Sequence, residues 1–351
     1  MGVSPTFAIP RASIAPVISR IITARTTTRP ISSVPSSRPG PPFINACTTW
    51  GFRIEQLDSH FLHDGQQPLR ITSLSPALGA EITGVDVSGA LSDADFSAVT
   101  QALHDHDGVL VLRDQNLSPD QHIKFSRRFG ELFGETEPYQ DTVTKYLLPG
   151  YPQIFRASNK IVEGEPQGRT RAGNYWHSDV SFRPRPAMVS ILYAIEIPSI
   201  GGDTLFCNMY SAYERLSDPV QQFLSSLTSR HDFARNTNIG FSHENISAQD
   251  LEGGNAAEHP VVRTHPESGR RCLFVNPGNT SRILELHPRE SDELLEFLFN
   301  HSVQEESIYR HRWSVNDLMI WDNRCVMHYA IADYDEDRYM HRTTVMGEKP
   351  V

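Results

Sequence analysis

Residues 318–329 have the sequence LMIWDNRCVMHY, which is a short apolar run, a polar turn and then a histidine, His328. The run at 318–321 predicts a strand, because short apolar runs bounded by turn residues are typical of strands. Comparable segments stand at 109–112, 190–197, 272–276 and 343–346. Many short strands separated by turns predict a mixed α+β fold built on a barrel or jelly roll, not a doubly wound sheet.

Two helices are predicted ahead of most of these strands. Ser92 begins a pattern that resembles a capping box, after which Phe96, Val99 and Leu103 fall on one face. The second helix is expected at residues 118–125 and has proline in its first turn, where no amide donor is lost. Both helices are expected to flank the strands as scaffold.

The first 55 residues differ in composition from the rest. Residues 1–53 contain no Asp or Glu but are rich in Arg, Ser, Thr and Pro. A segment of this kind cannot bury a core, and its composition is that of a mitochondrial transit peptide. We expect residues 1–55 to be a targeting segment or a disordered extension, and residues 56–351 to form the folded domain. The location is then mitochondrial or cytoplasmic.

The charge balance bears on the class of partner. With 42 acidic and 32 basic residues the net charge is −10, which argues against nucleic acid because phosphate binding needs clustered Lys and Arg. No apolar run is long enough for a membrane span. The four cysteines lie far apart, which predicts neither a disulfide framework nor a thiolate zinc site. A small-molecule partner fits best, and a homo-oligomer stays open.

Residues 174–182, with the sequence NYWHSDVSF, place His177 and Asp179 two positions apart. In a strand these side chains would share a face and could reach one ion. The pair alone is weak, because chance often supplies it. His328 is the candidate third ligand. Two histidines and one carboxylate with open positions suit ferrous iron that must also bind a cosubstrate and dioxygen.

Several motifs, taken in order, resemble the TauD/TfdA group of iron- and 2-oxoglutarate-dependent dioxygenases over residues 71–350. They are HSDV at 177–180, GGDTL at 201–205, LFVN at 273–276, WDNR at 321–324, HYA at 328–330 and MHR at 340–342. The resemblance implies a double-stranded β-helix with flanking helices. It also implies that His177, Asp179 and His328 bind Fe(II), and that 2-oxoglutarate and O2 are cosubstrates.

The resemblance also points to cosubstrate residues. 2-Oxoglutarate chelates iron through its keto acid end, and its distal carboxylate needs a cation, for which arginine offers a bidentate fork. Arg338 matches the family's arginine, and Thr204 matches the hydroxyl that holds the same carboxylate. Without the resemblance, Arg338 reads as a solvated charge in an acidic stretch and Thr204 as a turn residue.

Substrate residues follow from the taurine-cleaving members of the group. Arg342 matches the arginine that grips the sulfonate, although it could instead pair with a carboxylate of the protein. The backbone amide of Val180, the aromatic ring of Phe233 and Tyr139 complete the expected pocket. The implied reaction oxidises a small anionic substrate and releases succinate and CO2.

Two departures weaken taurine as the substrate. Residues 135–137 are Glu-Thr-Glu where taurine-cleaving members carry a histidine, and an acidic residue there would repel a sulfonate but could attract an amine. Asn279 stands where an aromatic wall is expected. Another sulfonate, an amino acid or a related acid is therefore open.

Two rival interpretations use the same three ligands. A non-catalytic jelly roll would use the metal only to staple strands, and would need no clamp such as Arg338. A metal-dependent hydrolase would use bound water as nucleophile, but an obvious general base is missing. A further group of imidazoles and a carboxylate, His104-Asp105-His106, ends a predicted helix and is interpreted as a set of polar side chains that face solvent.

Overall fold

The computed structural model of the chain describes residues 69–235 and 255–351. The predicted extension at 1–55 and the domain boundary at 56 lie outside these residues. The helices are α2 (Asp93–Asp105), α3 (Pro119–Ser126), α4 (Asp141–Thr144), α5 (Met209–Glu214), α6 (Asp218–Leu224), α9 (Pro288–Ser302) and the 3-10 helix η1 (Glu305–Ser307).

The strands are short and spread over the whole described chain. They are β1 (Arg70–Ser73), β2 (Ala80–Thr83), β3 (Val109–Leu112), β4 (Leu147–Leu148), β5 (Tyr151–Ser158), β6 (Ile161–Val162), β7 (Glu165–Pro166), β8 (Ala187–Glu196), β9 (Thr204–Asn208), β10 (Thr228–Asp232), β11 (Ala256–Pro260), β12 (Val262–Thr264), β13 (Arg271–Leu273), β14 (Thr280–Ile283), β15 (Ile308–His311), β16 (Leu318–Asp322), β17 (Val326–Ala330) and β18 (Tyr339–Met346).

The largest sheet has eight strands in the order β1-β2-β3-β16-β8-β18-β5-β4. Neighbours run antiparallel, except for the parallel pair β2 and β3. Four of the five predicted strands lie in it, as β3, β8, β16 and β18. The fifth prediction, 272–276, is wrong at its end. Strand β13 stops at Leu273, because Asn276 enters a turn that accepts the Thr280 N–H.

The central strands are apolar on both faces because both faces of the sheet are covered. In β3, Leu110 and Leu112 join a core under α2 and α3, while Val109 and Val111 join a second core on the opposite face. In β16, Leu318 and Ile320 likewise join the first core, while Met319 and Trp321 join the second. Burial on both sides explains continuous apolar runs in place of an apolar-polar alternation.

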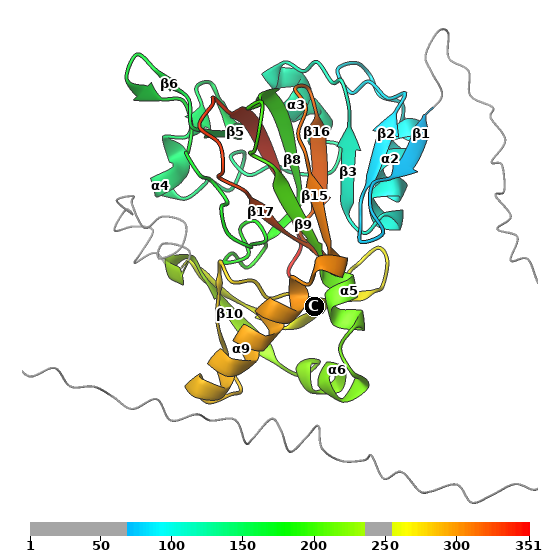
Figure 1. Ribbon diagram of the computed structural model, residues 1–351, viewed down its shortest axis with the longest axis vertical. Helices are drawn as coiled ribbons and strands as arrows, with labels where there is room; N and C mark the ends of the chain where they lie inside the picture. Colours follow the sequence, from blue (N-terminus) through cyan, green and yellow to red (C-terminus); the bar gives the residue numbers. More distant parts are fainter. Residues whose placement is uncertain (1–68, 236–254) are drawn as a thin grey trace, which may run out of the picture. The chain divides into compact units, whose positions relative to one another are not determined.

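Both predicted helices are confirmed. Ser92 caps α2 by accepting the Asp95 N–H, and Ser118 forms a capping box with Gln121 at the start of α3. A capping side chain satisfies backbone donors that have no partner inside the helix. Figure 1 shows α2 and α3 beside the eight-stranded sheet. They act as its outer cover.

The second face of the large sheet packs on a smaller sheet of order β15-β9-β17. Phe206 and Met327 from this smaller sheet meet Met319 and Trp321 of β16 in one core. Further along the chain, β10, β11 and β14 form a three-stranded sheet. In Figure 1 strand β10 and helices α5, α6 and α9 gather at the end opposite α3. The fold is thus mixed α/β with several sheets.

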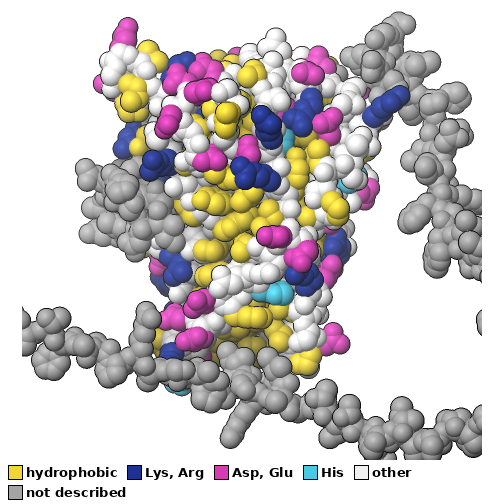
Figure 2. Space-filling model, viewed as in Figure 1, with side chains coloured by type: hydrophobic (Ala, Val, Ile, Leu, Met, Phe, Trp, Pro, Cys, Tyr) yellow, Lys and Arg dark blue, Asp and Glu magenta, His cyan; other side chains and the backbone are white. Residues whose placement is uncertain are grey.

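Among residues 69–235 and 255–351, no helix has the length and apolar character that crossing a membrane requires. On the face seen in Figure 2, hydrophobic side chains gather in the middle of the view, and acidic and basic side chains alternate around them.

Candidate active site

His177 and His328 are backbone partners. The His177 N–H donates to the His328 carbonyl at 3.1 Å, and the His328 N–H donates back to the His177 carbonyl at 2.9 Å. His177 and Asp179 do not share the face of one strand, because His177 forms only an isolated bridge and Asp179 already lies in a turn. The pairing with β17, not alternation along a strand, brings the side chains together.

The three predicted ligands form one buried group, which we call the metal cluster (His177, Asp179 and His328). His177 Nε2 lies 3.8 Å from Asp179 Oδ1, and His328 Nε2 lies 3.7 Å from Asp179 Oδ2. One ligand atom from each residue fits within 4.8 Å of the other two. Two imidazoles and a carboxylate therefore face one point.

The hydrogen on the His177 ring is placed by its neighbour. His177 Nδ1 lies 2.8 Å from the Tyr175 carbonyl oxygen, which can only accept a hydrogen bond. The proton therefore sits on Nδ1, and Nε2 keeps a lone pair directed at Asp179. Burial lowers the pKa of His177 and lowers that of His328 further. Both rings are held neutral, as metal ligands must be.

Asp179 is held from both sides. Arg342 Nη1 donates to Oδ1 at 2.6 Å, and Ser190 Oγ donates to Oδ2 at 2.7 Å. Burial alone would raise the pKa of this carboxyl, but Arg342 and the two histidines lower it to about 2. The predicted substrate arginine thus contacts a candidate ligand, while its buried Nε has no hydrogen-bond partner in the described part of the chain.

Arg338 offers donors that protein atoms do not use. Its side chain is buried, and Nε and Nη2 lack partners among the described residues. Idle buried donors are costly unless a ligand accepts from them. Thr204 lies on the same cavity, and its hydroxyl accepts from Trp313 Nε1 at 3.0 Å. The hydroxyl hydrogen is therefore free to donate. These groups fit a carboxylate such as the distal one of 2-oxoglutarate.

One cavity of about 110 Å³ joins the metal cluster to these arginines. All four predicted substrate residues line it, namely Tyr139, Val180, Phe233 and Arg342. Asn279 lines it as well. Val180 has a φ of +56°, a left-handed conformation that a β-branched residue rarely adopts. Such strain is typical of residues held in place at a functional site.

The acidic residues at 135–137 do not line this cavity. Glu135 pairs with Arg127 at 2.7 Å, and neither Glu135 nor Glu137 is part of the cavity wall. The idea that either attracts a substrate amine is not supported. Buried Arg169 also lines the cavity, and this cation was not predicted from the sequence. It lies in an Arg-rich stretch ahead of the HSDV motif, a signal too general to single it out.

Residues 70–344 match the family described as "Taurine catabolism dioxygenase TauD, TfdA family". The chain belongs to this family. It is an iron- and 2-oxoglutarate-dependent dioxygenase of the TauD/TfdA type, which confirms the enzyme class, the Fe(II) cofactor and the 2-oxoglutarate cosubstrate predicted from the sequence. The two rival interpretations, a structural metal site and a hydrolase, are set aside.

Relatives cover most of this TauD/TfdA chain. It is 34% identical to the alpha-ketoglutarate-dependent 2,4-dichlorophenoxyacetate dioxygenase of Cupriavidus pinatubonensis, over 79% of this chain and 98% of the relative. It is 32% identical to the alpha-ketoglutarate-dependent sulfonate dioxygenase of Saccharomyces cerevisiae, over 83% of this chain and 70% of the relative. A solved taurine dioxygenase from Burkholderia xenovorans superposes with a TM-score of 0.67 at 33% identity, over 81% and 91% of the two chains.

A second group of two histidines and one aspartate lies elsewhere in this dioxygenase. We call it the ion-pair cluster (His104, His265 and Asp322), and its candidate ligand atoms also lie within 4.8 Å of one another. His104 was predicted to be a solvent-exposed polar residue, but it is half-buried, with its ring centroid 5.5 Å from that of His265. Sequence spacing gave no sign of this meeting, because the three residues come from distant segments.

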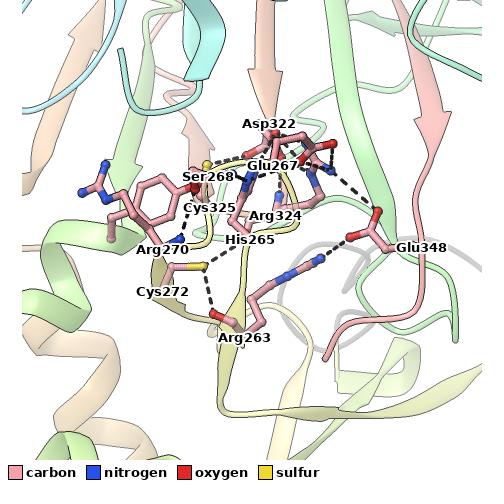
Figure 3. A network of polar contacts seen from close by, with 11 residues as sticks. Arg263, His265, Glu267, Ser268, Arg270, Cys272, Asp322, Arg324, Cys325 and Glu348 are labelled. Carbon is pink, nitrogen blue, oxygen red and sulfur yellow. Dashed lines mark hydrogen bonds and ion pairs between the residues drawn. The ribbon is translucent and has the colours of Figure 1, made fainter. Parts of the chain in front are cut away.

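The ion-pair cluster is filled by hydrogen bonds of its own (Figure 3). Arg324 donates to Asp322 through Nε at 2.9 Å and Nη2 at 2.7 Å. The Ser268 N–H points at His265 Nδ1, and His265 Nε2 donates to Asp322 at 3.1 Å. Nε2 carries a hydrogen whether the ring is neutral or charged. No lone pair of His265 faces the centre of this cluster.

Proposed function

We propose that His177, Asp179 and His328 hold Fe(II), and that Arg338 and Thr204 hold the distal carboxylate of 2-oxoglutarate. One observation carries the proposal. The lone pair on His177 Nε2 and the idle donors of Arg338 open onto one cavity. A metal centre and a carboxylate clamp on the same cavity are what a keto acid that chelates iron requires.

Bound iron supplies the oxidative chemistry that couples decarboxylation of 2-oxoglutarate to attack on a substrate C–H bond. The protein's own residues position and shield the reactants. Tyr175 fixes the His177 tautomer. Arg338 and Thr204 orient the cosubstrate by its far end. The apolar walls at Phe182 and Phe233 keep water away from the reacting carbon.

For the substrate we propose a sulfonate or carboxylate on an apolar body. Arg342 uses Nη1 on Asp179, which leaves Nε for an anionic head group. The amide of Val180 and the side chain of Tyr139 lie on the same cavity. Phe155, Phe182 and Phe233 line the rest with aromatic surface. Apart from Asp179 of the metal cluster, no acidic side chain of the described residues lines the cavity to pair with a substrate ammonium group, and this disfavours taurine and amino acids.

We infer that the large sheet and the β15-β9-β17 sheet are the two halves of a double-stranded β-helix. The support is their mutual packing through the Trp321 and Phe206 side chains, whose ring centroids lie 5.7 Å apart. Arg342 stands opposite Phe155 and Leu192 in the large sheet, and His328 stands opposite Phe206 in the small one. Both sheets thus contribute residues to the proposed site.

We also propose that residues 56–351 suffice for catalysis. The family match begins at residue 70, beyond the acid-free segment. A chain lacking residues 1–55 is expected to keep its kcat and KM. A reporter protein fused to residues 1–55 and located by microscopy tests mitochondrial targeting, and a cytoplasmic signal would contradict it.

Activity is tested with purified chain, Fe(II), ascorbate and 2-oxoglutarate. Succinate is measured by chromatography against a panel of alkyl sulfonates, aryl sulfonates, phenoxyacetates and amino acids. An anion with an apolar body is expected to give the fastest succinate formation, and His177→Ala is expected to give none. Failure of every compound to raise succinate above the no-substrate rate would refute the proposed substrate class.

A further inference from the structure

The turn that follows β16 faces two ways. Asp322 and Arg324 point to one side, into a network with Glu267 and Glu348 (Figure 3). Asn323, between them, points to the other side and reaches Asp179. The Asp322 N–H also donates to the Gly108 carbonyl at 2.8 Å. The ion pairs of Arg324 therefore hold the turn in place, and the turn sets the position of the Asn323 side chain.

Both polar atoms of the Asn323 side chain have hydrogen-bond partners. Its Oδ1 accepts from the Asp179 backbone N–H at 3.0 Å and from Trp321 Nε1 at 3.0 Å. Because two donors face this oxygen, the orientation of the amide is unambiguous. Its Nδ2 donates to Ser190 Oγ at 2.9 Å. The amide thus contacts the backbone of the proposed iron ligand and a hydroxyl beside it.

Ser190 links the Asn323 amide to the Asp179 carboxylate. Its hydroxyl accepts from Asn323, so its single hydrogen is directed at Asp179 Oδ2, 2.7 Å away. Ser190 is 0% and Asn323 1% exposed, so water does not compete for these bonds. The terminal torsion of an aspartate is soft, and a carboxylate without such partners samples many orientations.

We propose that Asn323 and Ser190 are positioning residues that fix the carboxylate of Asp179 for the metal. The proposal rests on the proposed function, because it takes Asp179 as an iron ligand. Arg342 holds Oδ1 and Ser190 holds Oδ2, so the carboxylate plane is set and its remaining lone pairs are directed toward the two imidazoles. Substitution of a residue that hydrogen-bonds to a metal ligand typically lowers metal affinity or activity by about 10- to 100-fold.

The first test compares two serine substitutions. Ser190→Ala removes the hydrogen bond to Asp179. Ser302→Ala removes an equally buried hydroxyl that donates to Leu298 within α9, away from the site. The Fe(II) dissociation constant is measured by anaerobic equilibrium dialysis, and unfolding by urea. Ser190→Ala is expected to weaken Fe(II) binding about 10- to 100-fold, and Ser302→Ala to leave it unchanged although both lose stability.

The second test asks whether the hydroxyl itself is responsible. Ser190→Thr keeps the hydroxyl and is expected to restore Fe(II) affinity and the Co(II) absorption spectrum of the unchanged chain. Asn323→Asp keeps the acceptor for Asp179 but removes the donor to Ser190, and is expected to weaken Fe(II) binding as Ser190→Ala does. Asn208→Asp is the matched control for stability, because this buried amide donates to Ala77 and Asp107 and has no contact with Asp179 or Ser190.

The outcomes separate the two proposals. Normal Fe(II) binding by Ser190→Ala, with binding lost in His177→Ala, would overturn the positioning role and leave the metal centre in place. Equal loss in Ser190→Thr and Ser190→Ala would also overturn it, because the hydroxyl would not be the cause. Normal binding by His177→Ala would overturn the metal centre itself.

Discussion

The metal cluster and the ion-pair cluster contain the same residue types, two histidines and one aspartate, with ligand atoms inside the same 4.8 Å. They differ in the position of one hydrogen. In the metal cluster the Tyr175 carbonyl accepts a hydrogen bond from His177 Nδ1–H, which leaves a lone pair on Nε2. In the ion-pair cluster a backbone N–H occupies His265 Nδ1, and Nε2 carries a hydrogen toward Asp322. Residue type and distance do not define a metal site; the partners of the imidazoles do.

The two aspartates differ in the same sense. Arg342 contacts Asp179 through one nitrogen at one oxygen. Arg324 uses a fork and its own backbone N–H on Asp322. A fork fills the carboxylate, whereas a single contact leaves lone pairs for an ion. The Arg324 guanidinium thus occupies both oxygens of Asp322, whereas the Arg342 guanidinium lies beside the proposed metal site.

The largest effect is expected from breaking the ion-pair cluster. Arg324→Met leaves the buried Asp322 carboxylate without its main cation. Unfolding free energy is expected to fall by about 3 to 5 kcal/mol, measured by urea denaturation of the metal-free chain. Metal analysis of the unchanged chain after dialysis against Zn(II) should find no ion at this cluster. A second bound equivalent would contradict the assignment of hydrogen to His265 Nε2.

Next in size is the loss of a proposed ligand. His177→Ala is expected to weaken Fe(II) binding by at least about 100-fold, since a ligand matters more than its partner. His265→Ala is the matched control, being a buried histidine beside an aspartate, and should keep normal Fe(II) affinity. Equal losses in both variants would erase the distinction between the clusters.

The cosubstrate clamp should show a similar but smaller effect. Arg338→Gln removes charge-assisted hydrogen bonds worth about 1.5 to 3 kcal/mol each to a carboxylate. The KM for 2-oxoglutarate is expected to rise about 10- to 100-fold, which matches the loss of one such bond. Arg338→Lys should recover part of the affinity, because a point charge remains without the fork. An unchanged KM would place the clamp elsewhere.

Acid lability should come from buried neutral histidines outside both clusters. Burial lowers the pKa of His122 to about 3, and of His259 and His341 to about 4, from 6.5 in the unfolded chain. Between pH 6.5 and these values only the unfolded chain takes up the protons. Stability therefore falls as pH decreases, by up to about 1.4 kcal/mol per pH unit per histidine. Urea midpoints at pH 7.5 and 5 test this, and His122→Asn should flatten the dependence.

The smallest effect is expected at Trp313. Trp313→Phe removes the hydrogen bond to Thr204 Oγ1 and frees the hydroxyl to rotate. One neutral hydrogen bond contributes about 0.5 to 1.5 kcal/mol. The KM for 2-oxoglutarate should rise by about 2- to 10-fold with kcat unchanged. A lower kcat with constant KM would assign Trp313 to the chemical step instead.

The elements that could be predicted from the sequence are those whose signals lie within the element itself. Apolar runs and capping residues located β3, β8, β16, β18, α2 and α3, because their causes lie within a few residues. The candidate ligands were found through motif order. Their real geometry was not, since the His177 bridge to His328 depends on a register that one sequence does not reveal. His104 and Asn323 were missed as contacts for the same reason, as their partners are distant in the chain.

The two hydrogen bonds between the backbones of His177 and His328 close residues 178–327 into a loop through main-chain atoms alone. In a protein that folds only around its metal, the ion must gather distant ligands from an unfolded chain. Here the burial of the hydrophobic core offsets the entropic cost of closing that loop. Replacing either imidazole should therefore change what the cluster can bind without opening this loop.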